Sequence, residues 1–102
     1  MTLKLTIRQA EALYNVFRDI VNQDPAPDVT ESLLKDLLKQ VFRKLESKLE
    51  ARLKGGGYSI SLTDMEAKAY YLYFNQRYLG EGWRYEQTFI NDQVRLLNKL
   101  YA

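Results

Sequence analysis

The chain has 102 residues, of which 46% are hydrophobic and 13% aromatic, and its formal net charge is +2. This length and apolar content exclude a disordered tail and predict one domain, over residues 1–102, with a core of its own. The sequence contains no cysteine and no histidine, which excludes disulfides, thiolate metal sites and a histidine general base. The composition therefore disfavours an enzyme, and we expect neither a metal nor another cofactor.

The first eight residues lack the uninterrupted apolar stretch of a secretory signal. Apolar runs elsewhere extend over only a few residues, whereas a membrane-spanning helix needs roughly 20. We therefore expect a cytoplasmic protein that has no membrane partner.

The hydrophobic pattern changes period near the start of the chain. Leu3, Leu5 and Ile7 alternate with polar residues, which predicts a strand near residues 3–6. Apolar residues then recur at helical spacing, which predicts a helix near 7–23. Thr6 and Gln9 match the capping-box pattern at the start of this helix.

Two prolines within residues 24–27 predict a stiff turn that separates the first helix from the second. Asp28 and Glu31 form another cap pattern, and a leucine-rich stripe follows. A helix near 29–54 is therefore predicted, ending at three glycines that disfavour helical backbone.

The second half of the chain repeats this order. A strand is predicted near 58–62, a capping box at Thr63 and Glu66, a helix near 64–79 and a helix near 84–101. The order strand, helix, helix thus occurs once before and once after Gly55–Gly57. Gly80 and Gly82 mark the break between the last two helices.

Residues 3–17 align with residues 60–74, which suggests an internal duplication. The matched pairs are Leu5 with Leu62, Thr6 with Thr63, Ala10 with Ala67, Ala12 with Ala69, Tyr14 with Tyr71 and Phe17 with Phe74. The predicted fold is therefore mainly α: a four-helix domain with a small two-stranded antiparallel β-ribbon, built from two strand-helix repeats related by a pseudo-two-fold axis. Two alternatives remain open: such matches arise without duplication because Thr caps and Ala spacers are common, and the ribbon could form between two chains.

The segment 29–57 carries most of the positive charge, with seven basic and four acidic residues. Lys44, Lys48 and Arg52 fall on one flank of the predicted helix with no acidic neighbour in the stripe. This flank could follow a nucleic-acid backbone by contacting phosphates. A solvated helix that carries cations near its C-terminus is the simpler interpretation.

The predicted helix 64–79 has apolar residues on two sides. One broad arc contains Ala67, Tyr70, Tyr71, Phe74 and Tyr78. Met65, Leu72 and Leu79 form a second stripe at seven-residue spacing, which predicts a self-association surface in a homodimer. The alternative is a central helix that other layers cover on both sides.

Aromatic residues are dense between residues 70 and 85. Helical spacing favours a core role for Tyr70, Tyr71 and Tyr78. Tyr73, Trp83 and Tyr85 lie nearer the polar border and are the candidates for contact with a protein partner.

Glu81 and Glu86 flank Trp83 and are the only carboxylate pair with a conceivable catalytic or cation-binding role, and this signal is weak. The other patterns are generic folding devices. We therefore expect a non-catalytic protein-interaction or scaffold domain that self-associates. A nucleic-acid-binding accessory protein is the second hypothesis, and an enzyme is a distant third.

Overall fold

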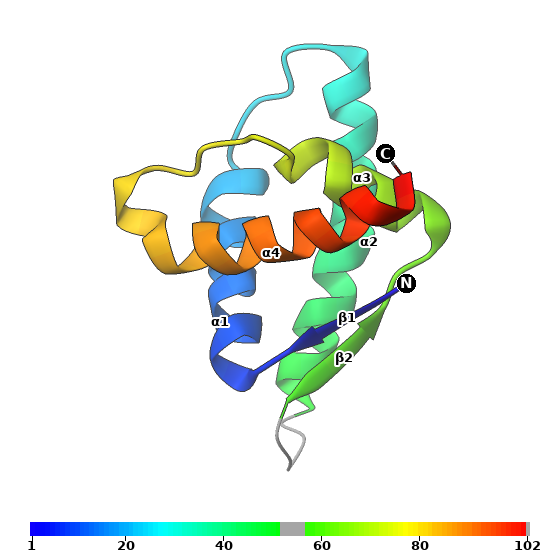
Figure 1. The fold of residues 1–102 in the computed structure, drawn as a ribbon. Helices are drawn as coiled ribbons and strands as arrows, with labels where there is room; N and C mark the ends of the chain where they lie inside the picture. The colour runs from blue at the N-terminus through cyan, green and yellow to red at the C-terminus, as the bar shows by residue number, and fades with distance from the viewer. Residues whose placement is uncertain (52–56, 102) are drawn as a thin grey trace.

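The computed structural model describes residues 1–51 and 57–101. Its elements, in chain order, are β1 (Thr2–Leu5), α1 (Ile7–Val16), a π-helical turn η1 (Phe17–Val21), α2 (Val29–Glu50), β2 (Tyr58–Ser61), α3 (Asp64–Phe74), a 3-10 turn η2 (Glu81–Trp83) and α4 (Arg84–Tyr101) (Figure 1). The prediction of a mainly α domain with four helices and a small antiparallel ribbon is confirmed.

The two strands pair with each other within the chain. They run antiparallel, with Leu3 opposite Ile60 and Leu5 opposite Tyr58. These four side chains are buried, whereas the alternate residues Thr2, Lys4, Ser59 and Ser61 are exposed. One face of the ribbon therefore packs on the helices and the other faces solvent, as strand alternation requires.

Gly57 lies at the end of the ribbon next to the backbone of β1. A Cβ atom at this position would lie only 2.4 Å from the carbonyl oxygen of Leu5. Because the clashing atom belongs to the backbone of a paired strand, it has little room to shift. Close approach explains why glycine stands here.

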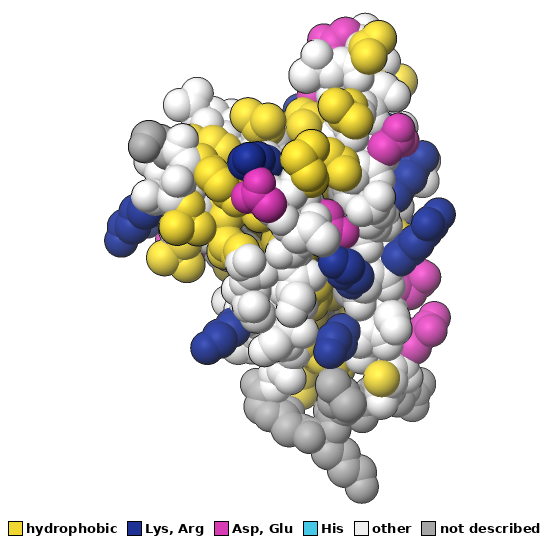
Figure 2. All heavy atoms as spheres, turned by 90° about the vertical axis from the view of Figure 1, so that its right-hand side faces the viewer, with side chains coloured by type: hydrophobic (Ala, Val, Ile, Leu, Met, Phe, Trp, Pro, Cys, Tyr) yellow, Lys and Arg dark blue, Asp and Glu magenta, His cyan; other side chains and the backbone are white. Residues whose placement is uncertain are grey.

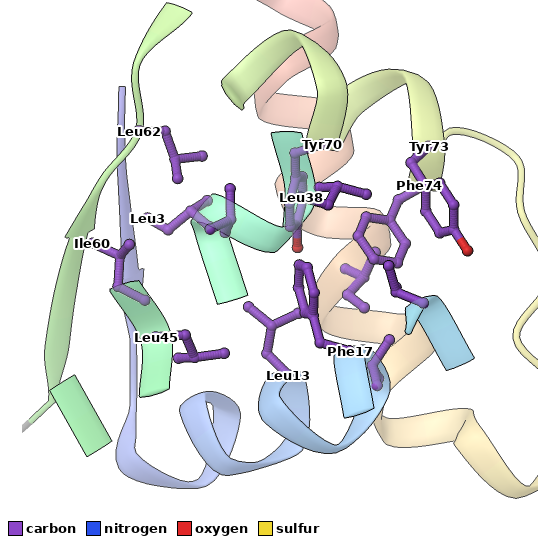
Figure 3. Close-up of a cluster of buried hydrophobic side chains, with 14 of the residues drawn as sticks. Leu3, Leu13, Phe17, Leu38, Leu45, Ile60, Leu62, Tyr70, Tyr73 and Phe74 are labelled. Atoms are coloured by element: carbon purple, nitrogen blue, oxygen red, sulfur yellow. The ribbon is translucent and has the colours of Figure 1, made fainter. Parts of the chain in front are cut away.

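The core lies between the ribbon and the helices (Figure 3). Leu3 and Ile60 approach it from the strands, and Leu45 from α2. Phe17 of η1 and Phe74 of α3 meet edge to face, with ring centroids 6.0 Å apart. Side chains from both halves of the sequence thus interdigitate in one core.

Three predicted helix caps are confirmed by hydrogen bonds. Both capping boxes are complete: Thr6 and Gln9 bond reciprocally, and so do Thr63 and Glu66. The amide of Glu31 donates to the Asp28 carboxylate over 2.8 Å. These local bonds satisfy first-turn amides and so fix where α1, α2 and α3 begin.

The predicted end of the third helix at residue 79 is wrong, because α3 ends at Phe74. Asn75 leaves the helical region with ψ 118°, and Gln76 has a left-handed φ of 60°. The Arg77 Nε–H donates to the carbonyl oxygen of Tyr73 over 2.7 Å and caps the freed end. The residues after Phe74 therefore follow a different path from the one that helical spacing implied.

The first helical segment reaches Val21, but its last turn is a π-helix rather than regular α-helix. For α2 the structure gives α-helix as far as Glu50, and the predicted end at 54 lies outside the described residues. Within the residues that are described, no helix is both long enough and apolar enough to span a membrane.

Candidate interaction surfaces

The outer side of α3 carries two exposed apolar side chains. Met65 is 54% exposed and Leu72 is 59% exposed, whereas the other side of the helix is buried. Their seven-residue spacing places them on the same side, two turns apart. Lys68 lies between them and pairs with Asp64 over 2.8 Å. An ion pair therefore interrupts the apolar surface.

The third residue of the predicted self-association stripe, Leu79, does not belong to this surface. It follows the end of α3 and is buried in the core, where its amide donates to the Gln87 side chain over 2.8 Å. The prediction of one Met65, Leu72, Leu79 stripe is therefore wrong in its geometry, because it assumed that the helix continued to residue 79.

Helix α2 adds apolar surface beside α3. Lys44 of α2 contacts Glu66 of α3, so the flank of α2 that carries Lys44 faces α3. Leu33 and Leu37 lie on that flank by helical spacing; Leu33 is exposed and Leu37 half-buried. We call Leu33, Leu37, Met65 and Leu72 the α2–α3 face. Figure 2 shows hydrophobic side chains gathered on the upper half of this side of the molecule.

Tyr73 is not available for an external contact, and its selection as a partner-contact residue is wrong. Only 1% of the residue is exposed, because the core-facing arc of α3 is wide enough to include it. The guanidinium carbon of Arg77 lies 3.9 Å from the centroid of the Tyr73 ring, so the guanidinium covers that ring. Burial raises the pKa of the Tyr73 hydroxyl, and that hydroxyl has no hydrogen-bond partner within the described residues.

Trp83 and Tyr85 are half-buried against the core, so each has a limited area to offer a partner. The Arg8 guanidinium lies 4.1 Å from the centroid of the Tyr85 ring and covers one of its faces.

Tyr78, for which helical spacing predicts a core role, is 71% exposed. That prediction is wrong, because Tyr78 lies beyond the end of α3.

One residue of the basic flank of α2, Lys44, makes its polar contacts inside the domain. The Lys44 ammonium donates to a carboxylate oxygen of Glu66 over 2.5 Å and to the carbonyl oxygen of Ser61 over 3.0 Å. It therefore joins α2 to β2 and α3. Arg52, the third predicted nucleic-acid contact, lies outside the described residues.

Glu66 is the buried partner in this cluster, with 2% of its side chain exposed. Burial acts to raise the pKa of Glu66, but hydrogen bonds from Lys44 and the Thr63 amide, together with the Lys44 charge, outweigh it. The pKa of Glu66 consequently lies below its ordinary value. The carboxylate is charged at neutral pH, and Lys44 supplies its counter-charge.

A groove of about 480 Å³ runs between α2 and β2. Arg43, Lys44, Ser47 and Lys48 of α2 line it, together with Ser59, Ile60 and Ser61 of β2. Figure 2 looks onto the right-hand side of the view in Figure 1, and several Lys and Arg side chains are visible on the lower half of this face. Two of the predicted basic contacts, Lys44 and Lys48, thus lie together in one concave site.

Comparison with known proteins gives no match. No family model, no curated protein and no solved structure is significantly similar to this chain. The described residues also hold no group of three or more His, Cys, Asp or Glu side chains that could bind a metal ion. The candidate sites are therefore the α2–α3 face and the α2–β2 groove, and neither depends on such a group.

Proposed function

We propose that this chain is a non-catalytic protein-interaction domain that self-associates through the α2–α3 face. The observation that carries the proposal is the exposure of Met65 and Leu72 on α3, whose opposite side is buried. Two copies related by a two-fold axis would bring this face against itself, as isologous interfaces do. The Lys68–Asp64 pair adds no net charge to the face.

The energy available predicts a weak association. Full burial of a Met or Leu side chain contributes about 1.5–3 kcal/mol, so a half-exposed one has about 1 kcal/mol left to gain. A dimer contains two Met65 and two Leu72 side chains, and these four would together contribute about 4 kcal/mol, near the lower limit of the free-energy cost of association. Leu33 and Leu37 must therefore take part, and a dimer would form only at high protein concentration.

The arrangement of Lys44 makes nucleic-acid binding the weaker hypothesis. A protein that follows a phosphate backbone needs cations that are free to displace counterions. Lys44 instead neutralises the buried Glu66 carboxylate and bonds to the backbone of β2. Among the described residues of the predicted basic stripe, only Lys48 lacks an acidic partner.

Replacing Leu72 by lysine tests the proposal. The side chain is 59% exposed, so the variant should fold, while the dimer would have to bury a new charge in each copy. Sedimentation velocity over a concentration series should show self-association of the unaltered chain and its loss in Leu72→Lys. Circular dichroism checks that the variant is folded.

Leu96→Lys is the matched control. Leu96 is 56% exposed on α4 and lies 200° around the helix from Asn98, which bonds to α3 through Tyr71. The proposal expects Leu96→Lys to associate like the unaltered chain. Equal weakening by both substitutions, or an unaltered chain that is monomeric at every concentration, would contradict it.

A further inference from the structure

We propose that the α2–β2 groove binds an extended, acidic segment of another protein, which adds to the ribbon as a third strand along the free edge of β2. This site is separate from the α2–α3 face, so the inference does not depend on self-association. It rests on the backbone geometry of β2, the shape of the groove and its charge.

The hydrogen-bond register shows which backbone groups of β2 are directed away from β1. Met1 and Leu62 bond to each other in both directions, so they form a hydrogen-bonded pair. In an antiparallel ladder such pairs alternate with non-bonded pairs, so Leu3 bonds to Ile60, whereas Ser59 and Ser61 direct their backbone groups to the free edge. The Lys44 ammonium, which bonds to the Ser61 carbonyl from outside the ribbon, agrees with this register.

The free edge of β2 therefore offers three backbone groups to an added strand. These are the amide and carbonyl of Ser59 and the amide of Ser61, because Lys44 takes the Ser61 carbonyl. Natural edge strands are commonly protected by short length, charged side chains, proline, a bulge or a covering helix. β2 is short, with four residues, but it contains no charged side chain, proline or bulge, and its edge positions carry serine.

The groove has the form that strand addition requires. One wall is the edge of β2 and the other is the side of α2, over a volume of about 480 Å³. An extended peptide in this position would alternate its side chains between solvent and α2. Main-chain hydrogen bonds to the β2 edge would supply affinity, and contacts between α2 and every second side chain of the peptide would supply specificity.

The charge of the groove indicates an acidic ligand. Arg43 and Lys48 line it, and neither makes an ion pair within residues 1–51 and 57–101. Among the residues that the structure describes, no acidic side chain lines the groove. Glutamate or aspartate on the α2-facing side of an added strand would therefore meet cations that have no partner inside the described part of the domain.

A polypeptide fits this site better than a nucleic acid does. Strand addition uses backbone donors and acceptors together, and a phosphate backbone supplies acceptors alone. Lys44 and Lys48, the two predicted phosphate contacts in the groove, also differ in availability, because the ammonium of Lys44 is already bonded to the Glu66 carboxylate. Nucleic acid is nevertheless the outcome to exclude, because it would use the same cations.

The experiment measures fluorescence anisotropy of labelled octapeptides titrated with the Leu72→Lys protein, so that self-association does not interfere. The probes are an alternating Glu-Val peptide, an alternating Lys-Val peptide and a Glu-Val peptide that is N-methylated at alternate residues. We expect saturable binding of the first, no binding of the second, and binding about tenfold or more weaker for the third, which lacks the donors to the edge.

Ser59→Pro tests the edge from the protein side. The proline removes one edge donor without breaking a bond to β1, since the Ser59 amide faces away from it. Thr2→Pro is the matched control, because the Thr2 amide faces the outer edge of β1 on the far side of the ribbon. Ser59→Pro should weaken Glu-Val binding by about tenfold or more, and Thr2→Pro should leave it unchanged.

Three results would overturn the proposal: no saturable binding of the Glu-Val peptide, equal binding of its N-methylated form, or equal loss in both proline variants. A labelled single-stranded oligonucleotide that binds well and is insensitive to Ser59→Pro would assign the groove to phosphates instead. Should Ser59→Pro fail to fold by circular dichroism, the N-methylated peptide on the Leu72→Lys protein decides the question.

Discussion

Leu3 of β1 and Ile60 of β2 lie directly opposite each other, and the alignment of residues 3–17 with 60–74 makes the same two residues equivalent. Phe17 and Phe74, which the alignment also equates, have ring centroids only 6.0 Å apart. Equivalent residues meet in this way where a two-fold axis passes between them. The ribbon and the aromatic contact below it thus have the arrangement expected of two related strand-helix units.

Removing the Lys44 ammonium should destabilise the domain in a pH-dependent way. Lys44→Met leaves Glu66 nearly buried without its counter-charge, and we expect the free energy of unfolding at neutral pH to fall by about 1–3 kcal/mol. The folded-state pKa of Glu66 is lowered, so the contribution of the pair is complete above the ordinary glutamate pKa of about 4.5. It is lost as the pH falls through the folded-state value.

Urea denaturation at neutral pH and at about pH 3 measures this effect. The difference between the unaltered chain and Lys44→Met should be smaller at the lower pH, because the charge of Glu66 is lost as the pH falls through its lowered folded-state pKa. Lys48→Met, one turn further along α2, is the control and should change stability little at either pH. A penalty for Lys44→Met that does not depend on pH would show that packing of its aliphatic stem, rather than its charge, stabilises the fold.

Two neighbouring buried tyrosines should respond in opposite ways to the loss of their hydroxyl groups. The Tyr70 hydroxyl donates to the Gln93 side chain over 2.5 Å in the buried core. Tyr70→Phe would leave that amide oxygen unsatisfied and should cost about 1–3 kcal/mol. The Tyr73 hydroxyl has no partner within the described residues, so Tyr73→Phe should be neutral or stabilising.

Thermal and urea unfolding of the two phenylalanine variants provide the comparison. Each substitution removes a single oxygen atom from the same helix, so differences in helix propensity and packing volume largely cancel. A loss of stability in Tyr73→Phe as large as that in Tyr70→Phe would mean that the Tyr73 hydroxyl has a bonding partner after all.

The fold could be predicted largely because local signals and hydrophobic period agreed. The Thr6 and Thr63 capping boxes place the starts of α1 and α3 correctly, and the alternation in both strands shows which side chains face the core. The end of α3 could not be predicted in this way. Tyr78 and Leu79 continue the helical spacing by coincidence, although the backbone has already left the helix with a left-handed φ at Gln76, beside the end that Arg77 caps.

The candidate sites were less accessible to sequence reasoning. The burial of Tyr73 depends on how α2 and α3 pack, and the helical pattern alone assigned it to the border. The sequence pattern predicts a surface cation at Lys44 and a capping carboxylate at Glu66, whereas the structure joins the two residues, 22 positions apart in sequence, in one ion pair. The α2–β2 groove follows from strand register and the position of α2 together, neither of which is a local property.

A dilution series of ¹H–¹⁵N correlation spectra tests, residue by residue, whether the chain self-associates through the α2–α3 face. On concentration from low micromolar to millimolar, the amides of Met65, Lys68 and Leu72 should shift progressively, and those around Leu96 should not. The same spectra of Leu72→Lys should be independent of concentration. Spectra of the unaltered chain that do not change over this range, or shifts confined to β2 or α4, would contradict the account.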